Sequence, residues 1–179
     1  MKVLLALSRG IDKLNDKFAI LATWAVLASC VISALNATVR YAFNYSSNGY
    51  SEIQWYLFAA VVMLGASQVL RINEHVRVDV LYGLYGGRGQ AIVDLLGFIF
   101  FLMCSMSVLL YYSWPLFIRM YLSGEMSNNA GGLIRWPVML LLPVGFTLIL
   151  LQGLSEIIKR LAWLNNSYDG DFHYERPLQ

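Results

Sequence analysis

Long runs of uncharged, mostly apolar residues divide the 179-residue chain into four segments. Lys, Arg, Asp, Glu and His are absent from residues 18–39, 53–70, 95–118 and 136–155. A helix of about 20 residues crosses roughly 30 Å of bilayer hydrocarbon, so each run reaches or approaches the length of a membrane span. The pattern predicts an all-α integral membrane protein with four transmembrane helices, over about residues 18–42, 52–72, 92–120 and 136–160. A soluble helical bundle is the alternative, but it would have to bury each long helix on every side.

The first 17 residues show a different, amphipathic pattern. Charged side chains alternate with apolar ones that recur at spacings of three and four residues, namely Leu4, Leu7, Ile11, Leu14 and Phe18. A basic helix of this kind buries one face at the membrane surface and keeps its charges in water. We therefore expect a short N-terminal amphipathic interfacial helix before the first span. The alternative is that this stretch merely lengthens the first span.

Local sequence signals mark the start of the second span and the segment between the second and third spans. Ser51 followed by Glu52 is typical of a helix start, with a hydroxyl cap and an acid in the first turn. Charge is dense over residues 71–81, where Val76 and Val80 share a helical stripe. We expect an interfacial helical segment between the second and third spans, broken at Gly86-Gly87. A strand over residues 76–80 ranks second, because it would leave its backbone groups unpaired at the membrane surface.

The composition agrees with a membrane protein. Hydrophobic residues make up 58% of the chain and charged residues 13%, whereas a soluble domain carries about a quarter charged residues. The net charge of +2 is too small to indicate a nucleic-acid partner. We expect one membrane domain over residues 1–163, followed by a polar C-terminal tail over residues 164–179.

The positive residues are distributed unevenly around the predicted spans. Of the thirteen Lys and Arg residues, ten fall on one side of the membrane if the spans alternate in direction. Only three, Arg40, Arg119 and Arg135, fall on the other side. Because cytoplasmic loops carry the excess of Lys and Arg, this bias predicts a multi-pass protein with both termini and the middle loop in the cytoplasm.

The centres of the spans lack the groups that membrane chemistry requires. They contain no ionisable residue of the kind that marks proton relays and ion paths. The chain has two histidines, His75 and His173, and neither lies where it could ligate a haem between helices. No nucleophile–base pair, phosphate loop or metal spacing is present. We therefore expect no cofactor, no metal and no enzymatic activity, and a small chain without repeated halves is not expected to transport a solute alone.

Several motifs now point to a family. They are Ser51-Glu52-Ile53 leading into an aromatic helix, Gly65-Ala66-Ser67, and the segment from Glu74 to Leu81, which reads Glu-His-Val-Arg-Val-Asp-Val-Leu. The chain resembles the DctQ-like small membrane subunit of tripartite ATP-independent periplasmic (TRAP) transporters over about residues 10–163. The stretches 124–127, 129–133 and 135–137 are similar to the branch named for mannitol, chloroaromatic compounds or 2-oxo acids, which implies organic acid uptake.

The resemblance implies a non-catalytic scaffold role in a bacterial inner membrane. Such a subunit pairs with a large multi-span M-type permease, which carries the solute and sodium sites, and with a P-type periplasmic binding protein that captures the solute. Import is then sodium-driven rather than ATP-driven, and membrane lipid is a further partner. The rival hypothesis is a stand-alone four-helix interaction or assembly protein without a transport partner. The solute itself is not encoded in a chain of this kind.

The resemblance also implies roles for particular residues. A structural set is expected to hold the fold and the contact with the permease, and it consists of Glu52, Trp55, Gly65, His75, Arg77 and Asp79. A second set, in an outer loop, is expected to dock the binding protein, and it consists of Glu125, Asn128, Asn129 and Arg135. For the charged or titratable members of the structural set, structural ion pairing is a simpler interpretation than a catalytic role.

Overall fold

The computed structural model describes residues 1–45, 47–73, 85–129 and 131–168, and within them every regular element is a helix. The elements in chain order are α1 (Lys2–Phe43), α2 (Asn48–Ile72), α4 (Gly87–Leu96), η1 (Gly97–Met103), α5 (Cys104–Ser123) and α6 (Trp136–Leu164). The π-helical η1 joins α4 to α5, so that Gly87–Ser123 is one helix of 37 residues. Four helices are thus long and apolar enough to cross a membrane, which confirms the predicted all-α, multi-pass fold.

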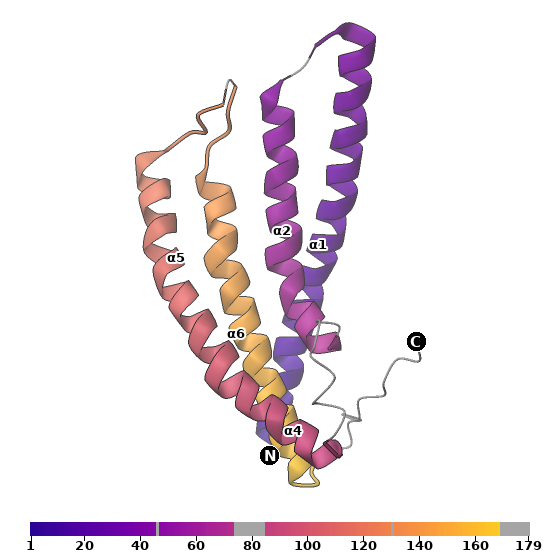
Figure 1. Cartoon of the computed structure of the whole chain (residues 1–179), viewed down its shortest axis with the longest axis vertical. Coiled ribbons are helices and arrows are strands. Elements are labelled where there is room, and N and C mark those ends of the chain that lie inside the picture. The colour runs from indigo at the N-terminus through magenta and orange to yellow at the C-terminus, as the bar shows by residue number, and fades with distance from the viewer. Residues whose placement is uncertain (46, 74–84, 130, 169–179) are drawn as a thin grey trace.

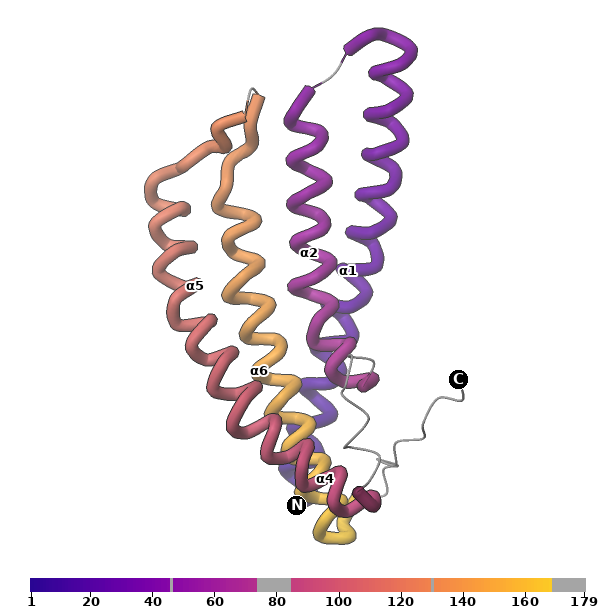
Figure 2. Tube along the Cα trace, viewed as in Figure 1, coloured from indigo at the N-terminus to yellow at the C-terminus, as the bar shows by residue number. Residues whose placement is uncertain are grey.

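The helices form a bundle around α6. Figure 1 shows the α1–α2 pair on one side and the α5–α6 pair on the other. The tube in Figure 2 shows that the two pairs converge at one end, which we call the base, and separate toward the other, which we call the top. The base holds the N-terminal part of α1, the C-terminal ends of α2 and α6, and α4; the top holds residues 44, 45 and 47 together with 124–129 and 131–135. Helix α6 packs against α1, α2, η1 and α5, and it contributes the largest set of buried residues.

An apolar contact joins α1, α2 and α6 between the two ends. Ala22, Leu64 and Leu148 are buried there, with Phe18 and Val144 among the partly buried side chains around them. Small residues bring the backbones together, as is usual for helices that cannot rely on a hydrophobic driving force in lipid. This contact is the centre of the bundle, and it is free of ionisable side chains.

The N-terminal amphipathic segment is helical, as expected, but it is not a separate interfacial helix. Helix α1 runs without interruption from Lys2 to Phe43. Its buried face at the base is mostly polar, because Ser8 and Asn15 turn toward α6 and only Ile11 of the apolar positions is buried with them, while Leu7 and Leu14 stay exposed. Hydrogen bonds to α6 hold this segment in line with the first span, and the prediction of a surface helix was wrong for that reason.

The start of α2 also differs from the prediction. The helix begins at Asn48, and its cap is Ser47, whose Oγ accepts a hydrogen bond from the Gly49 backbone N at 3.3 Å. Ser51 therefore lies inside the first turns rather than at the cap, and the Glu52 carboxylate serves another purpose, described below. At the other end α2 terminates in a left-handed residue, Asn73. The predicted interfacial segment over residues 74–84 lies outside the described residues.

Candidate functional site

A buried polar cluster ties α1 to α6 at the base. Asn15 Nδ2 donates a hydrogen bond to Gln152 Oε1 at 2.6 Å, and Gln152 Nε2 donates to Asp12 Oδ1 at 3.1 Å. Ser155 Oγ donates to the same Asp12 oxygen at 2.9 Å and lies 2.7 Å from Ser8 Oγ. All five side chains are buried. Buried polar groups need partners, and in this register of α1 against α6 each of the five side chains has at least one, although Asn15 Oδ1 itself accepts no hydrogen bond.

Charged side chains extend the cluster to the other helices. Lys159 Nζ lies 2.8 Å from Asp12 Oδ2 and 2.9 Å from Glu156 Oε1. Arg160 pairs with Glu156 at 2.6 Å on its own helix and with Asp94 of α4 at 3.0 Å. The Arg160 guanidinium also lies over the ring of Phe98, 4.5 Å from its centroid. The base is therefore held by a network of ions that are paired and largely withdrawn from water.

Helix α2 joins the same network through Arg71. Its guanidinium forms an ion pair with Asp16 of α1, and its Nη1 donates to the Asp12 backbone oxygen at 3.4 Å. Ion pairs or hydrogen bonds at the base thus link α1, α2, α4 and α6. We call this set of side chains the base cluster, and it consists of Ser8, Asp12, Asn15, Asp16, Arg71, Asp94, Gln152, Ser155, Glu156, Lys159 and Arg160.

At the top a second polar site surrounds Glu52. Its side chain is 4% exposed, and its carboxylate accepts hydrogen bonds from the Ser127 hydroxyl, from Asn129 Nδ2 at 2.7 Å and from the Leu133 backbone N at 2.7 Å. All three donors belong to the segment between α5 and α6. The first turns of α2 therefore hold the outer loop, and close approach of Gly49 to the Gly131 backbone oxygen brings the two segments together.

The outer loop is itself a small hairpin. Met126 and Ile134 form an antiparallel bridge, and backbone hydrogen bonds flank it on both sides. Arg135 Nη1 lies 2.7 Å from Glu125 Oε1, so the two charges of the hairpin pair with each other at its open end. Both side chains remain accessible, as does Asn128. The described residues of the loop therefore present a polar surface that hydrogen bonds and an ion pair hold together.

The charged side chains of the described chain thus gather at the two ends of the bundle, whereas a few uncharged polar side chains, such as the buried Ser67, lie between them. The described residues include no group of three or more His, Cys, Asp or Glu side chains that could hold a metal ion. The apolar contact around Ala22, Leu64 and Leu148 separates the base cluster from the Glu52 site. Such an arrangement is suited to fixing helices relative to one another and to presenting surfaces at each end.

The protein-family model for the DctQ component of tripartite ATP-independent periplasmic transporters matches residues 18–162 of the chain. The chain belongs to the DctQ family. A Haemophilus influenzae protein, named as a candidate TRAP transporter small permease protein, is 32% identical to it over 91 residues. The aligned stretch is 51% of this chain and 56% of that relative, so the chain spans little more than half the relative's length. No solved structure matches the chain. The DctQ family comprises transporter components and not enzymes.

The structure places the predicted DctQ residues in different surroundings. Trp55 is on α2 and 67% exposed, whereas a Cβ at Gly65 would make an ordinary contact with Ala22, 3.8 Å away. Glu52 and the outer-loop residues Ser127 and Asn129 come together, although the sequence assigned Glu52 and Asn129 to separate sets. The other three residues of the structural set, His75, Arg77 and Asp79, lie outside the described residues.

Sequence reasoning missed most of the base cluster. A signal was present in α1, where Ser8, Asp12 and Asn15 are spaced by four and three residues and so share one helical face. Helix α6 carries a matching polar face that begins at Gln152 and continues through Ser155 and Glu156. Two polar faces of this kind in neighbouring apolar helices indicate a contact between them.

Proposed function

We propose that this chain is the small accessory subunit of a sodium-coupled TRAP solute importer in a bacterial inner membrane, where it braces the large permease. The observation that carries the proposal is the segregation of charged side chains to the two ends of the bundle. The described core contains no ionisable side chain at mid-depth that could bind a travelling ion or solute. A chain whose helices are linked by ion pairs at the base and whose middle carries no charge is suited to serve as a fixed frame.

The same proposal sets the orientation in the membrane. The base carries Lys2, Arg9, Lys13, Lys17, Arg71, Arg88, Lys159 and Arg160, whereas the top carries Arg40, Arg119 and Arg135. The excess of positive charge supports a cytoplasmic base and a top that faces the periplasm. The outer loop would then meet a periplasmic binding protein, and the exposed Trp55 on α2 would meet the permease.

Within this proposal, Glu52 positions the docking loop instead of touching the permease. Its carboxylate is enclosed by Ser127, Asn129 and Leu133, which leaves little of it to face a partner. The loop then holds Glu125, Asn128 and Arg135 in a fixed arrangement toward the periplasm. A preorganised surface loses less conformational entropy on docking than a mobile loop does.

Co-purification and uptake test the main proposal. The chain is tagged and extracted in mild detergent together with whatever it binds, and uptake driven by a sodium gradient is measured in cells with and without it. We expect a larger multi-span protein to co-purify, and we expect uptake to fall when this chain is absent. A chain that is stable alone, with uptake unchanged in its absence, would refute the scaffold role and favour a stand-alone assembly protein.

A charge swap separates docking from loop structure. Glu125→Arg alone breaks the ion pair with Arg135, whereas Glu125→Arg combined with Arg135→Glu restores a pair of inverted polarity. If the loop docks the binding protein through these charges, both variants should reduce uptake while the membrane complex still assembles. Recovery of uptake in the swapped variant would mean that the pair only shapes the loop.

A further inference from the structure

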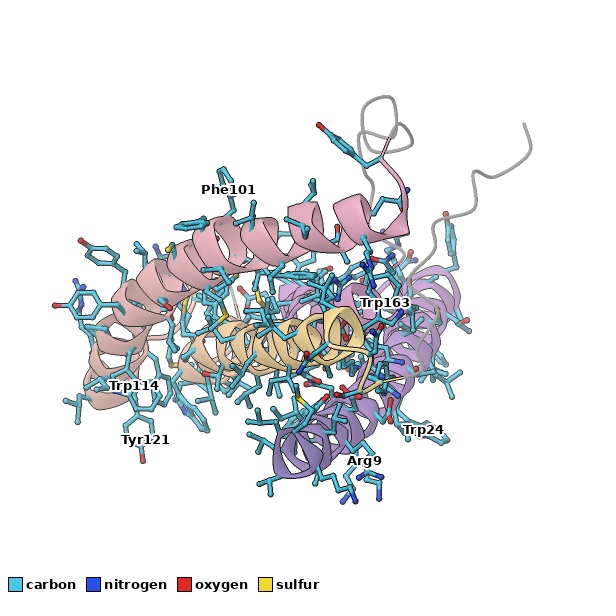
Figure 3. All side chains as sticks on the ribbon, turned by 90° about the horizontal axis from the view of Figure 1, so that it is seen from below. Arg9, Trp24, Phe101, Trp114, Tyr121 and Trp163 are labelled. Atoms are coloured by element: carbon cyan, nitrogen blue, oxygen red, sulfur yellow. The ribbon has the colours of Figure 1, made fainter. Side chains whose placement is uncertain are left out.

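A row of basic side chains follows one face of α1 near the base. Arg9, Lys13 and Lys17 are spaced four residues apart, and Lys2 precedes Arg9 by seven residues, so all four project from the same side of the helix. All four are exposed, and the buried polar side chains of α1 lie on the opposite face. Figure 3 shows Arg9 pointing away from the bundle. We call these four residues the basic row.

Among the residues that the structure describes, the basic row differs from the basic side chains of the base cluster because none of its members pairs with an acid. Arg71, Lys159 and Arg160 each form ion pairs in the base cluster. Within the part of the chain that the structure describes, no ion pair involves a member of the basic row, and Arg9 donates only to a backbone oxygen of its own helix. The two acids nearest in sequence, Asp12 and Asp16, are already engaged by Lys159 and Arg71. The row therefore presents uncompensated positive charge.

The same face of α1 becomes apolar above the basic row. Ile20 follows Lys13 by seven residues and Trp24 follows Lys17 by seven, so each apolar side chain stands two turns above a lysine. Ile20 is 58% exposed and Trp24 is 64% exposed, and Trp24 points outward in Figure 3. Leu27 continues this face and is 53% exposed. Cations followed along the helix axis by exposed apolar side chains match the layout of a phospholipid, with its headgroup phosphate and its acyl chains.

We propose that the basic row binds the headgroups of anionic phospholipids, with the acyl chains lying along Ile20, Trp24 and Leu27. From Arg9 to Lys17 the helix rises about 12 Å, and long basic side chains extend toward the headgroup layer, so several of them can reach one patch of lipid phosphate. An anionic lipid is favoured over a zwitterionic one. A zwitterionic headgroup also carries a positive group, which the basic row would repel and which no unpaired acid beside the row could bind. This inference does not depend on the transport role of the chain.

Binding of lipids to the full-length chain tests the proposal. Native mass spectrometry of the detergent-solubilised protein, titrated with phosphatidylglycerol or phosphatidylcholine of identical acyl chains, gives the apparent affinity for each. Each basic residue near an anionic surface strengthens binding about fivefold. We therefore expect Lys13→Gln/Lys17→Gln to weaken phosphatidylglycerol binding roughly 30-fold and to leave phosphatidylcholine binding unchanged. Lys13→Arg/Lys17→Arg should retain the preference for phosphatidylglycerol.

A control of equal charge shows whether the position matters. Arg40→Gln/Arg119→Gln removes two exposed cations at the top and should leave phosphatidylglycerol binding intact. Raising the ionic strength should weaken phosphatidylglycerol binding to the unmodified chain, which tests the charge dependence without any substitution. Equal losses in the two glutamine variants, or no preference for phosphatidylglycerol in the unmodified chain, would overturn the proposal. The proposal would also be overturned if Lys13→Gln/Lys17→Gln kept the lipid preference but lost a co-purifying protein. The ligand of the row would then be an acidic protein surface.

Discussion

Close packing of α2 against α6 makes a sharp prediction at Gly145. A Cβ built on this residue would lie 2.8 Å from Met63 Cβ and 2.9 Å from the Met63 backbone oxygen. Packed carbon atoms normally approach to about 3.5–4.0 Å, so the two helices would have to separate locally by roughly 1 Å. A rotamer change cannot relieve the contact, because Met63 meets it with its Cβ and its backbone.

The expected cost of Gly145→Ala follows from two opposing effects. Overpacking a core costs about 1–3 kcal/mol, whereas replacing glycine by alanine inside a helix recovers up to about 1 kcal/mol. We expect a net loss of roughly 1–2 kcal/mol in the free energy of unfolding. Gly65→Ala is the matched control, because its Cβ would meet Ala22 at an ordinary 3.8 Å, and it should be neutral or slightly stabilising.

Unfolding of the purified chain in mixed micelles, by increasing the fraction of sodium dodecyl sulfate and following helix content by circular dichroism, measures both variants. Gly145→Ala should unfold at a lower detergent fraction than the unmodified chain, and Gly65→Ala should not. The reverse order would refute the close approach of α2 to α6. If Gly65→Ala leaves the isolated chain stable but abolishes permease co-purification, Gly65 lies at the partner interface that the sequence predicted.

Three further predictions concern the two polar sites and the exposed face of α2. Arg160→Met should destabilise the chain by roughly 3 kcal/mol in the same unfolding assay, because Glu156 and Asp94 each lose their ion pair with Arg160 while Glu156 keeps its pair with Lys159, and adding Glu156→Gln should restore part of the loss. Glu52→Gln should speed proteolysis of the outer loop without changing helix content, whereas Glu125→Gln in the same loop should have a smaller effect; equal rates would contradict the role of Glu52 as the loop's anchor. Trp55→Ala should change the stability of the free chain by no more than about 0.5 kcal/mol yet reduce recovery of the permease, and unchanged recovery would remove this side chain from the interface.

The membrane fold was predictable because its physical cause acts on the sequence directly. The part of a helix that crosses hydrocarbon must be apolar, so each of the four uncharged runs falls inside one of α1, α2, the Gly87–Ser123 helix and α6, although α1 begins at Lys2, well before its run. The residues at which the helices begin and end were less predictable. Charged residues such as Asp94 mark the edge of hydrocarbon, but the helix continues beyond them because the side chain is paired with Arg160.

The candidate sites were harder to predict because pairing depends on tertiary contacts. Glu52 was identified from its motif, but nothing in its neighbourhood of the sequence indicates that Leu133, 81 residues away, would supply a hydrogen bond to it. At the N-terminus the apolar positions suggested a helix lying on the membrane. The interactions that fix this segment are instead polar. Helical spacing places Ser8, Asp12 and Asn15 on one face of α1, but their hydrogen-bond partners, Gln152 and Ser155, lie on another helix and cannot be inferred from that spacing.

The base cluster also constrains how the chain is made. Asp12 and its hydrogen-bond partner Gln152 are 140 residues apart, and they belong to the first and the last helix. At a synthesis rate of about 5–20 residues per second, roughly 7–28 s separate the emergence of the two residues from the ribosome. During this interval the polar face of α1 must be sheltered by water, lipid headgroups or the insertion machinery. Biogenesis, and not only the finished fold, therefore depends on the last helix, and a product truncated before residue 152 would display an unpaired polar face to the cell's quality control.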